Sequence, residues 1–231
     1  MLAAELKVLS ALLRGQPRSG SHAERLQAFY APQAGHYDRF RERLLWGRQR
    51  LIAALPCEPG ARVVELGAGT GRNTEFFGER LAGLQSCTLV DLCPALLQQA
   101  HLRAARQQNM VVIEADAAEY QPPEPVDVVY LSYALSMMPD WARVLDNALS
   151  MLRPGGVLGV VDFYVDPVRH GRLASWAWRR WFAHDGVHLG ADTLRHLPTR
   201  LTTLRLVEHR AAVPYLPAVR VPVYLFVGRK A

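Results

Sequence analysis

The hydrophobic positions of the chain form short apolar runs, separated by segments that favour helices. The runs predict strands at residues 61–66, 87–91, 111–114, 126–132 and 157–163. Helices are predicted between them, at residues 72–81, 94–108 and 143–152. Strands that alternate with helices favour a parallel sheet with helices on both faces.

The last part of the chain departs from this alternation. Residues 204–213 and 221–227 predict consecutive strands, joined by a segment that contains proline. That segment is too short for the crossover helix that parallel neighbours need. We therefore expect the last strand to run antiparallel.

The N-terminal part is helical by pattern. Residues 1–13 predict a short amphipathic helix, residues 14–21 a loop, and residues 23–55 a helical region with breaks near Pro32 and Gly35. The division that we expect is a helical cap at 1–55, followed by a domain at 56–231.

Composition places the chain among globular proteins. It has 231 residues, of which 50% are hydrophobic, which is enough for one sizeable core. Its apolar runs fall short of the roughly 20 residues that span a bilayer, and we expect a cytoplasmic protein. Cys57, Cys87 and Cys93 are scattered and odd in number, as is typical of reduced thiols. The net charge of +6 favours an anionic partner, such as a membrane surface or a nucleic acid.

A glycine-rich turn follows the first predicted strand. Glu65 ends the strand, and Gly67, Gly69 and Gly71 come next at alternate positions. Glycine lets the backbone approach a ligand closely, and the helix that follows directs N–H groups at an anion. A dinucleotide fingerprint needs glycine where Arg72 stands, and the Gly-Lys-Ser/Thr ending of a phosphate loop is absent. The form resembles the S-adenosylmethionine (SAM) loop of class I methyltransferases.

Polar residues also follow the later strands, whose carboxyl ends meet at one edge of a parallel sheet. We expect Asp91 to bind the ribose hydroxyls, Asp116 the adenine amine, and Ser132 to lie beside the sulfonium. Glu65 either orders the glycine turn or meets the amino group of SAM. Alone, each residue is equally typical of a turn or a helix cap. The expected cofactor residues are Glu65, Gly67, Ala68, Gly69, Gly71, Asn73, Asp91, Leu92, Asp116, Ala117 and Ser132.

Three further strings resemble the bacterial betaine-lipid methyltransferases of the BtaB type. They lie at residues 29–48 (FYAPQAGHYDRFRERLLWGR), 133–141 (YALSMMPDW) and 221–230 (VPVYLFVGRK). The resemblance implies a Rossmann-like class I methyltransferase, with a mostly parallel seven-stranded sheet, an antiparallel last strand and an N-terminal helical extension. It also implies three N-methylations of diacylglycerylhomoserine, with S-adenosylhomocysteine as the co-product.

Methylation of an amine needs a free lone pair, so the site must favour the neutral amine or take its proton. Aromatic faces can follow the cation that forms. The candidates for these roles are Tyr37, His36 and Tyr133, with Tyr30 behind them. Arg41 or Arg48 would bind the homoserine carboxylate. Alternatively, His36 and the two arginines are ordinary surface residues.

The segment after the fifth predicted strand is amphipathic, and we expect a substrate- or membrane-facing insertion at about residues 166–200. On a helical wheel, one side carries Arg169, Arg172, Arg179 and Arg180, with Trp176. The other side carries Leu173, Ala174, Ala177, Trp178, Trp181 and Phe182. This pattern is typical of a helix in a membrane interface, but also of a helix whose apolar face packs on the sheet.

Other functions are less well supported. His184 and His188 have no obvious third partner for a metal, and we expect none. Nucleic-acid amino-methylating enzymes usually carry Asn/Asp-Pro-Pro-aromatic where this chain has residues 132–135 (SYAL). A phosphatidylethanolamine or other small-molecule methyltransferase is a close alternative, and a non-catalytic SAM-binding module a distant one. We therefore expect a lipid substrate at the membrane surface, with the protein peripheral on the inner face of the cytoplasmic membrane, and no nucleic acid as partner. The oligomeric state stays open.

Overall fold

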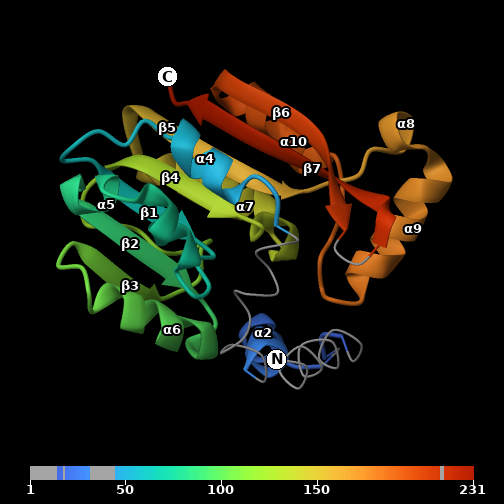
Figure 1. Ribbon diagram of the computed structural model, residues 1–231, viewed down its shortest axis with the longest axis horizontal. Coiled ribbons are helices and arrows are strands. Elements are labelled where there is room, and N and C mark those ends of the chain that lie inside the picture. Colours follow the sequence, from blue (N-terminus) through green and yellow to red (C-terminus); the bar gives the residue numbers. More distant parts are fainter. Residues whose placement is uncertain (1–14, 18, 32–44, 214–215) are drawn as a thin grey trace.

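The computed structural model describes residues 15–17, 19–31, 45–213 and 216–231 (Figure 1). These residues form a seven-stranded sheet with the strand order β3-β2-β1-β4-β5-β7-β6. Its strands are β1 (Arg62–Leu66), β2 (Ser86–Asp91), β3 (Met110–Glu114), β4 (Val126–Ser132), β5 (Leu152–Phe163), β6 (Thr202–Val213) and β7 (Leu216–Arg229).

Strand directions confirm the predicted architecture. The pairs β1–β2, β2–β3, β1–β4 and β4–β5 are parallel, whereas β7 is antiparallel to both β5 and β6. The antiparallel strand therefore lies inside the sheet, between two strands that precede it in the sequence. The sheet is therefore mostly parallel and Rossmann-like, as the sequence predicts.

The described helices surround the sheet. They are α2 (His22–Tyr30), α4 (Arg48–Ala54), α5 (Arg80–Gly83), α6 (Pro94–Ala104), α7 (Trp141–Met151), α8 (Pro167–His170), α9 (Arg172–Ala183) and α10 (Asp192–Arg200), with the 3₁₀ helices η1 (Arg72–Phe77) and η2 (Leu135–Met137). One core cluster joins α4 and α6 to one face of the sheet, and another joins α7 and α10 to the opposite face. Val63 and Val64 enter different clusters, as side chains alternate along a strand.

The single helix expected at residues 72–81 is a wrong prediction. The segment forms η1 and then α5, and Gly78, with φ of +57°, ends η1. A residue with positive φ cannot continue a right-handed helix, which explains the break. The predicted helix at 94–108 is also shorter, since α6 ends at Ala104.

The N-terminal helices contribute to two different places. In α2, Leu26, Phe29 and Tyr30 form a small core with Cys93 and Leu96, so this helix lies beside α6 (Figure 1). The other helix, α4, packs within the main core of the sheet. Most of the remaining cap expected at 1–55, including residues 1–14 and 32–44, lies outside the described residues.

The segment after β5 corrects one alternative from the sequence. In α9 only Ser175 and Phe182 are buried, and Trp178 is half-buried. The rest of the predicted apolar face is exposed, namely Leu173, Ala174, Ala177 and Trp181. Packing of that whole face on the sheet is therefore wrong. Within the part of the chain that the structure describes, no helix has the length and apolar character needed to cross a membrane.

Candidate functional site

A cavity of about 280 Å³ lies at the carboxyl ends of the central strands. The glycine turn after β1 forms one wall, and the segments after β2, β3 and β4 form others. Residues of α2 and α4 complete it. The expected cofactor residues that line it are Gly67, Ala68, Gly69, Asn73, Asp91, Leu92, Asp116, Ala117 and Ser132, together with Tyr30, Arg48 and Tyr133. Glu65 and Gly71 are not among the lining residues.

The glycine turn needs its glycines for two reasons. Gly67 has φ of +71°, and a Cβ there would lie 2.4 Å from the Cβ of Ala134. Gly71 also has φ of +71°, and its Cβ would lie 2.8 Å from the side chain of Leu89. The first glycine therefore lets the turn pass against the segment after β4, and the last lets it pack against β2.

Asp91 fastens the turn to the end of β2. Its Oδ2 accepts from the Gly69 N–H at 2.7 Å, and its Oδ1 accepts from the Cys93 N–H at 2.8 Å. Burial raises the pKa of Asp91, and these backbone hydrogen bonds oppose the rise. Each carboxylate oxygen keeps a further lone pair, which suits a pair of ribose hydroxyls in the cavity.

A buried polar chain lies behind the cavity. The Arg48 Nε donates to Asn73 Oδ1 at 2.7 Å, and Asn73 Nδ2 donates to Glu65 Oε1 at 2.5 Å. The Tyr130 hydroxyl donates to Glu65 Oε2 at 2.8 Å. Burial raises the pKa of Glu65 to about 7. Glu65 thus supports Asn73, and through it Arg48, from behind the cavity lining.

Two buried polar atoms of the cavity have no hydrogen-bond partner among the described residues. They are Ser132 Oγ and His22 Nδ1. Both residues line the cavity, beside the carboxylates of Asp91 and Asp116. Such atoms are costly unless a ligand or water satisfies them. The donor set fits SAM, which offers ribose hydroxyls, an adenine amine and a carboxylate for Arg48.

His22 is a lining residue that the sequence analysis missed. It begins α2 directly after Ser21, whose side chain caps the helix. Burial, and then Arg25, lower its pKa. The capping box Ser21–Glu24 could have located the start of this helix, but nothing local indicates that the helix covers the cavity.

Tyr133 adopts a strained conformation at the end of β4. Among the described residues it is the non-glycine residue with positive φ, at 55°. Its hydroxyl donates to the Trp46 carbonyl at 2.5 Å, and its ring lies 4.6 Å from that of Phe163. Burial raises its pKa well above the usual value. The hydroxyl proton of Tyr133 is engaged and hard to remove, so this geometry suits an aromatic contact with the methylated cation better than removal of a proton from the amine.

Of the other residues expected near the methyl acceptor, the structure describes Tyr30. The Tyr30 hydroxyl donates to Met137 Sδ at 3.1 Å, at the wall of the cavity. His36, Tyr37 and Arg41 lie outside the described residues.

A second cavity of about 230 Å³ shares Met138 and Pro139 with the first. Its described lining includes Asp162, Asp192, His188, Trp141 and Tyr224, and no lysine or arginine. The Tyr224 hydroxyl is buried there without a hydrogen-bond partner among those residues. Negative charge beside aromatic rings suits a cation better than an anion.

Asp162 holds the wall between the two cavities. Its carboxylate accepts from the Ser136 N–H at 2.8 Å, the Ser136 hydroxyl at 2.7 Å and the Phe163 N–H at 2.7 Å. Burial raises its pKa to about 6. Sequence reasoning missed this aspartate because it lies within an apolar strand, where the pattern indicates core.

The described residues contain no group of three or more His, Cys, Asp or Glu that could hold a metal ion. His184 and His188 are both exposed. The N–H of His188 donates to the Ser136 carbonyl at 2.7 Å, so this residue connects the segment after α9 to the cavity wall.

Comparison with known proteins decides the family. The family model described as "Methyltransferase domain" matches residues 37–207. The chain belongs to this methyltransferase family. The chain therefore carries a methyltransferase domain.

Curated relatives of this methyltransferase carry another name than the betaine-lipid enzymes. A trans-aconitate 2-methyltransferase of Methylobacterium radiotolerans is 32% identical over 152 residues, which cover 65% of this chain and 57% of the relative. One of Shigella flexneri serotype 5b is 25% identical over 182 residues, covering 73% and 70%. The chain thus spans little more than half the length of the first relative.

Solved structures agree on the fold of the methyltransferase. N-methyltransferase NodS of Bradyrhizobium japonicum, in complex with S-adenosyl-L-homocysteine, has a TM-score of 0.65 at 21% identity, covering 90% of this chain and 96% of that chain. Phospholethanolamine N-methyltransferase 2 of Haemonchus contortus has a TM-score of 0.73 at 16% identity, covering 93% and 61%. At these identities the likeness shows the fold alone.

Proposed function

We propose that this methyltransferase transfers methyl groups from SAM to the amine of diacylglycerylhomoserine. The observation that carries the proposal is the second cavity, which adjoins the cofactor cavity at Met138 and Pro139. Asp162 and Asp192 are the acidic groups of its described lining, and Asp192 also lies 4.0 Å from Arg195. Because that lining has no lysine or arginine, it favours an ammonium group over a polycarboxylate. The resemblance to betaine-lipid enzymes supplies the identity of the amine.

The second cavity also provides the conditions for amine methylation. Each transfer moves a methyl group to nitrogen and releases one proton, because the acceptor enters as an ammonium ion. Asp162 and His188 are the groups there that can take that proton. Trp141 and Tyr224 offer aromatic faces to the methylated cation. Alignment of amine and methyl group supplies the rest of the acceleration.

Arg48 takes a different role from the one expected. It is buried, lines the cofactor cavity and is fixed by Asn73. It is not among the lining residues of the second cavity. We therefore assign Arg48 to the carboxylate of SAM and not to the homoserine carboxylate.

The curated relatives favour a second candidate, methylation of trans-aconitate. That acceptor carries three carboxylates, and its binding asks for several cations around it. The aspartates of the second cavity disfavour it. Phosphatidylethanolamine is a third candidate, because its amine would suit the same cavity, and nucleic acid remains the candidate from another class.

Methyl-labelled SAM tests these acceptors side by side. The purified chain is given detergent micelles of diacylglycerylhomoserine or phosphatidylethanolamine, trans-aconitate, or an oligonucleotide. We expect label in the first lipid alone, with mono-, di- and trimethylated products in sequence. Asp91→Ala serves as the cofactor-site control. Label in trans-aconitate and none in the lipid would overturn the proposal while leaving the methyltransferase assignment intact.

A further inference from the structure

The α8–α9 segment exposes an unusual set of large apolar side chains. Figure 1 shows both helices at one end of the molecule, beyond the end of β5. Val168 is 89% exposed, Leu173 79%, Trp176 64% and Trp181 61%. Exposed large apolar groups clustered on one element usually mark an interaction surface.

The α8–α9 segment is also strongly basic. Between Pro167 and Ala183 the chain carries Arg169, Arg172, Arg179 and Arg180, and no aspartate or glutamate. Arg172, Trp176 and Arg180 follow one another at intervals of one helical turn, so they share a face. Arg172, Arg179 and Arg180 have no acidic partner among the described residues. Their charges therefore remain available to an anionic surface.

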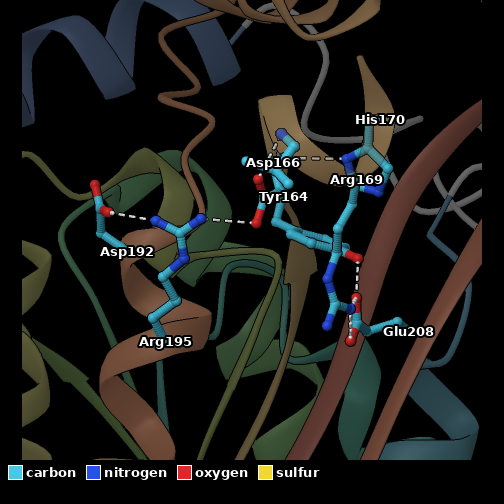
Figure 2. Close-up of polar contacts among 8 residues, drawn as sticks. Tyr164, Asp166, Arg169, His170, Asp192, Arg195 and Glu208 are labelled. Carbon is cyan, nitrogen blue, oxygen red and sulfur yellow. Dashed lines mark hydrogen bonds and ion pairs between the residues drawn. The ribbon is translucent and has the colours of Figure 1, made fainter. Parts of the chain in front are cut away.

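A polar network fixes this segment to the sheet, as Figure 2 shows. Glu208 of β6 pairs with Arg169 and accepts a hydrogen bond from the Tyr164 hydroxyl. Arg195 of α10 pairs with Asp166 at 2.8 Å. The Asp166 N–H donates to His170 Nδ1 at 3.0 Å, across α8. These contacts fix α8 to β6 and α10, and α9 follows directly after it.

The segment is also connected to the site. Phe182, at the end of α9, packs against Phe163 with ring centroids 4.7 Å apart. Phe163 in turn lies against Tyr133, which lines the cofactor cavity. A few residues beyond α9, His188 joins the wall of the second cavity. A surface bound by α9 would thus lie close to the walls of the two cavities.

We propose that the exposed face of α8 and α9, formed by Val168, Arg172, Leu173, Trp176, Arg179, Arg180 and Trp181, docks on a bilayer that carries anionic phospholipids. Tryptophan rings and arginines suit the head-group region, where each basic residue is attracted to anionic lipid. Val168 and Leu173 supply aliphatic surface that can enter the acyl boundary. Aliphatic groups gain nothing from a nucleic-acid backbone, and the concentrated positive charge opposes contact with a second copy of the same face.

The inference goes beyond the proposed function and does not depend on it, since a soluble acceptor would leave the surface unchanged. Sedimentation with vesicles tests it on the full chain. The vesicles contain phosphatidylcholine alone, or phosphatidylcholine with phosphatidylglycerol, and no diacylglycerylhomoserine. We expect binding to the anionic vesicles, at least tenfold weaker binding to the neutral ones, and marked weakening by added salt.

Two variants separate the contributions of the surface. The first is a double variant, Trp176→Ala with Trp181→Ala. The second is a triple variant, Arg172→Gln with Arg179→Gln and Arg180→Gln. Each variant should weaken vesicle binding at least tenfold. The matched control is Leu102→Ala, since Leu102 is 62% exposed but lies on α6. SAM affinity reports correct folding and should be unchanged in all of them.

Three outcomes would overturn the docking surface. The first is vesicle binding that both variants retain. The second is binding of an oligonucleotide that equals vesicle binding and survives loss of the tryptophans. The third is a dimer, measured by light scattering, that only the tryptophan variant loses. Methyl transfer to micellar lipid is a separate measurement, so failure of docking and failure of the proposed function are distinguishable.

Discussion

The hydroxyl of Tyr133 donates a hydrogen bond to the main-chain carbonyl of Trp46, 2.5 Å away. This contact joins the end of β4 to the turn that begins α4, two segments far apart in the sequence. The residue that donates it has a positive φ of 55°. The wall of the cofactor cavity therefore depends on a residue of the N-terminal part of the chain.

Tyr133→Phe tests this contact. The ring stays, but the Trp46 carbonyl loses its partner in a partly buried place, which costs about 1 kcal/mol or more. We expect the free energy of unfolding in urea to fall by about 1 kcal/mol or more. Tyr224→Phe is the matched control, because its hydroxyl is buried without a partner among the described residues and its removal should be neutral or stabilising. Equal effects of the two changes would contradict the assignment.

Asp91→Ala should weaken SAM binding by more than tenfold, measured by calorimetry. The change removes the acceptor for the ribose hydroxyls, and it frees the Gly69 N–H that Asp91 now holds. Asp91→Asn keeps one carbonyl oxygen and should weaken binding less. An affinity of Asp91→Ala within twofold of the wild type would remove Asp91 from the cofactor site.

Gly67→Ala should disrupt the turn for steric reasons. The new Cβ would meet the Cβ of Ala134 at 2.4 Å, and both groups belong to the walls of the cavity. Gly60→Ala is the matched control, since Gly60 also has positive φ, at +81°, but no atom lies within 4 Å of its Cβ position. We expect Gly67→Ala to cost at least about 2 kcal/mol more than the control. A similar loss in both would show that backbone strain alone matters.

Glu65 predicts a pH dependence of stability. Its pKa rises from 4.5 to about 7 on folding, so the folded state binds the proton more tightly than the unfolded state. Its contribution to stability is therefore full below the unfolded pKa and is lost as the pH rises through the folded pKa. The loss between pH 4.5 and 7 is at most about 3 kcal/mol.

Glu65→Gln should remove this slope. The free energy of unfolding, measured in urea at pH 5 and pH 8, should then differ less in the variant than in the wild type. Glu58→Gln is the control, since Glu58 is exposed. An unchanged slope in Glu65→Gln would show that another group carries the dependence.

Residues of the cofactor cavity at the ends of the strands could be predicted from the sequence, because the topology of the sheet determines where they lie. Asp91 ends β2 and Asp116 lies two residues beyond the end of β3, so the neighbouring parallel strands bring both to the cavity beside the glycine turn. His22 and Asp162 could not be predicted as lining residues, since their places depend on how α2 and the segment after β4 pack. The break at Gly78 could not be predicted either, because helix propensity does not report where a residue takes positive φ.

The amphipathic segment shows a different limit. Its alternation of arginine and apolar residues was visible in the sequence, but the side that faces the protein was not. That side depends on Phe182 meeting Phe163, a contact between elements. Periodicity therefore predicted the helix and left its orientation to tertiary packing.

The position of β7 has a consequence for the order of assembly during synthesis. Because β7 lies between β5 and β6, the strand β6 cannot join the sheet until the later strand has left the ribosome. Until then β5 presents an unpaired edge, and α10 lacks part of its apolar partner surface. Nascent chains that stop before β7 should thus expose a template for strand addition, which makes them natural clients for chaperones.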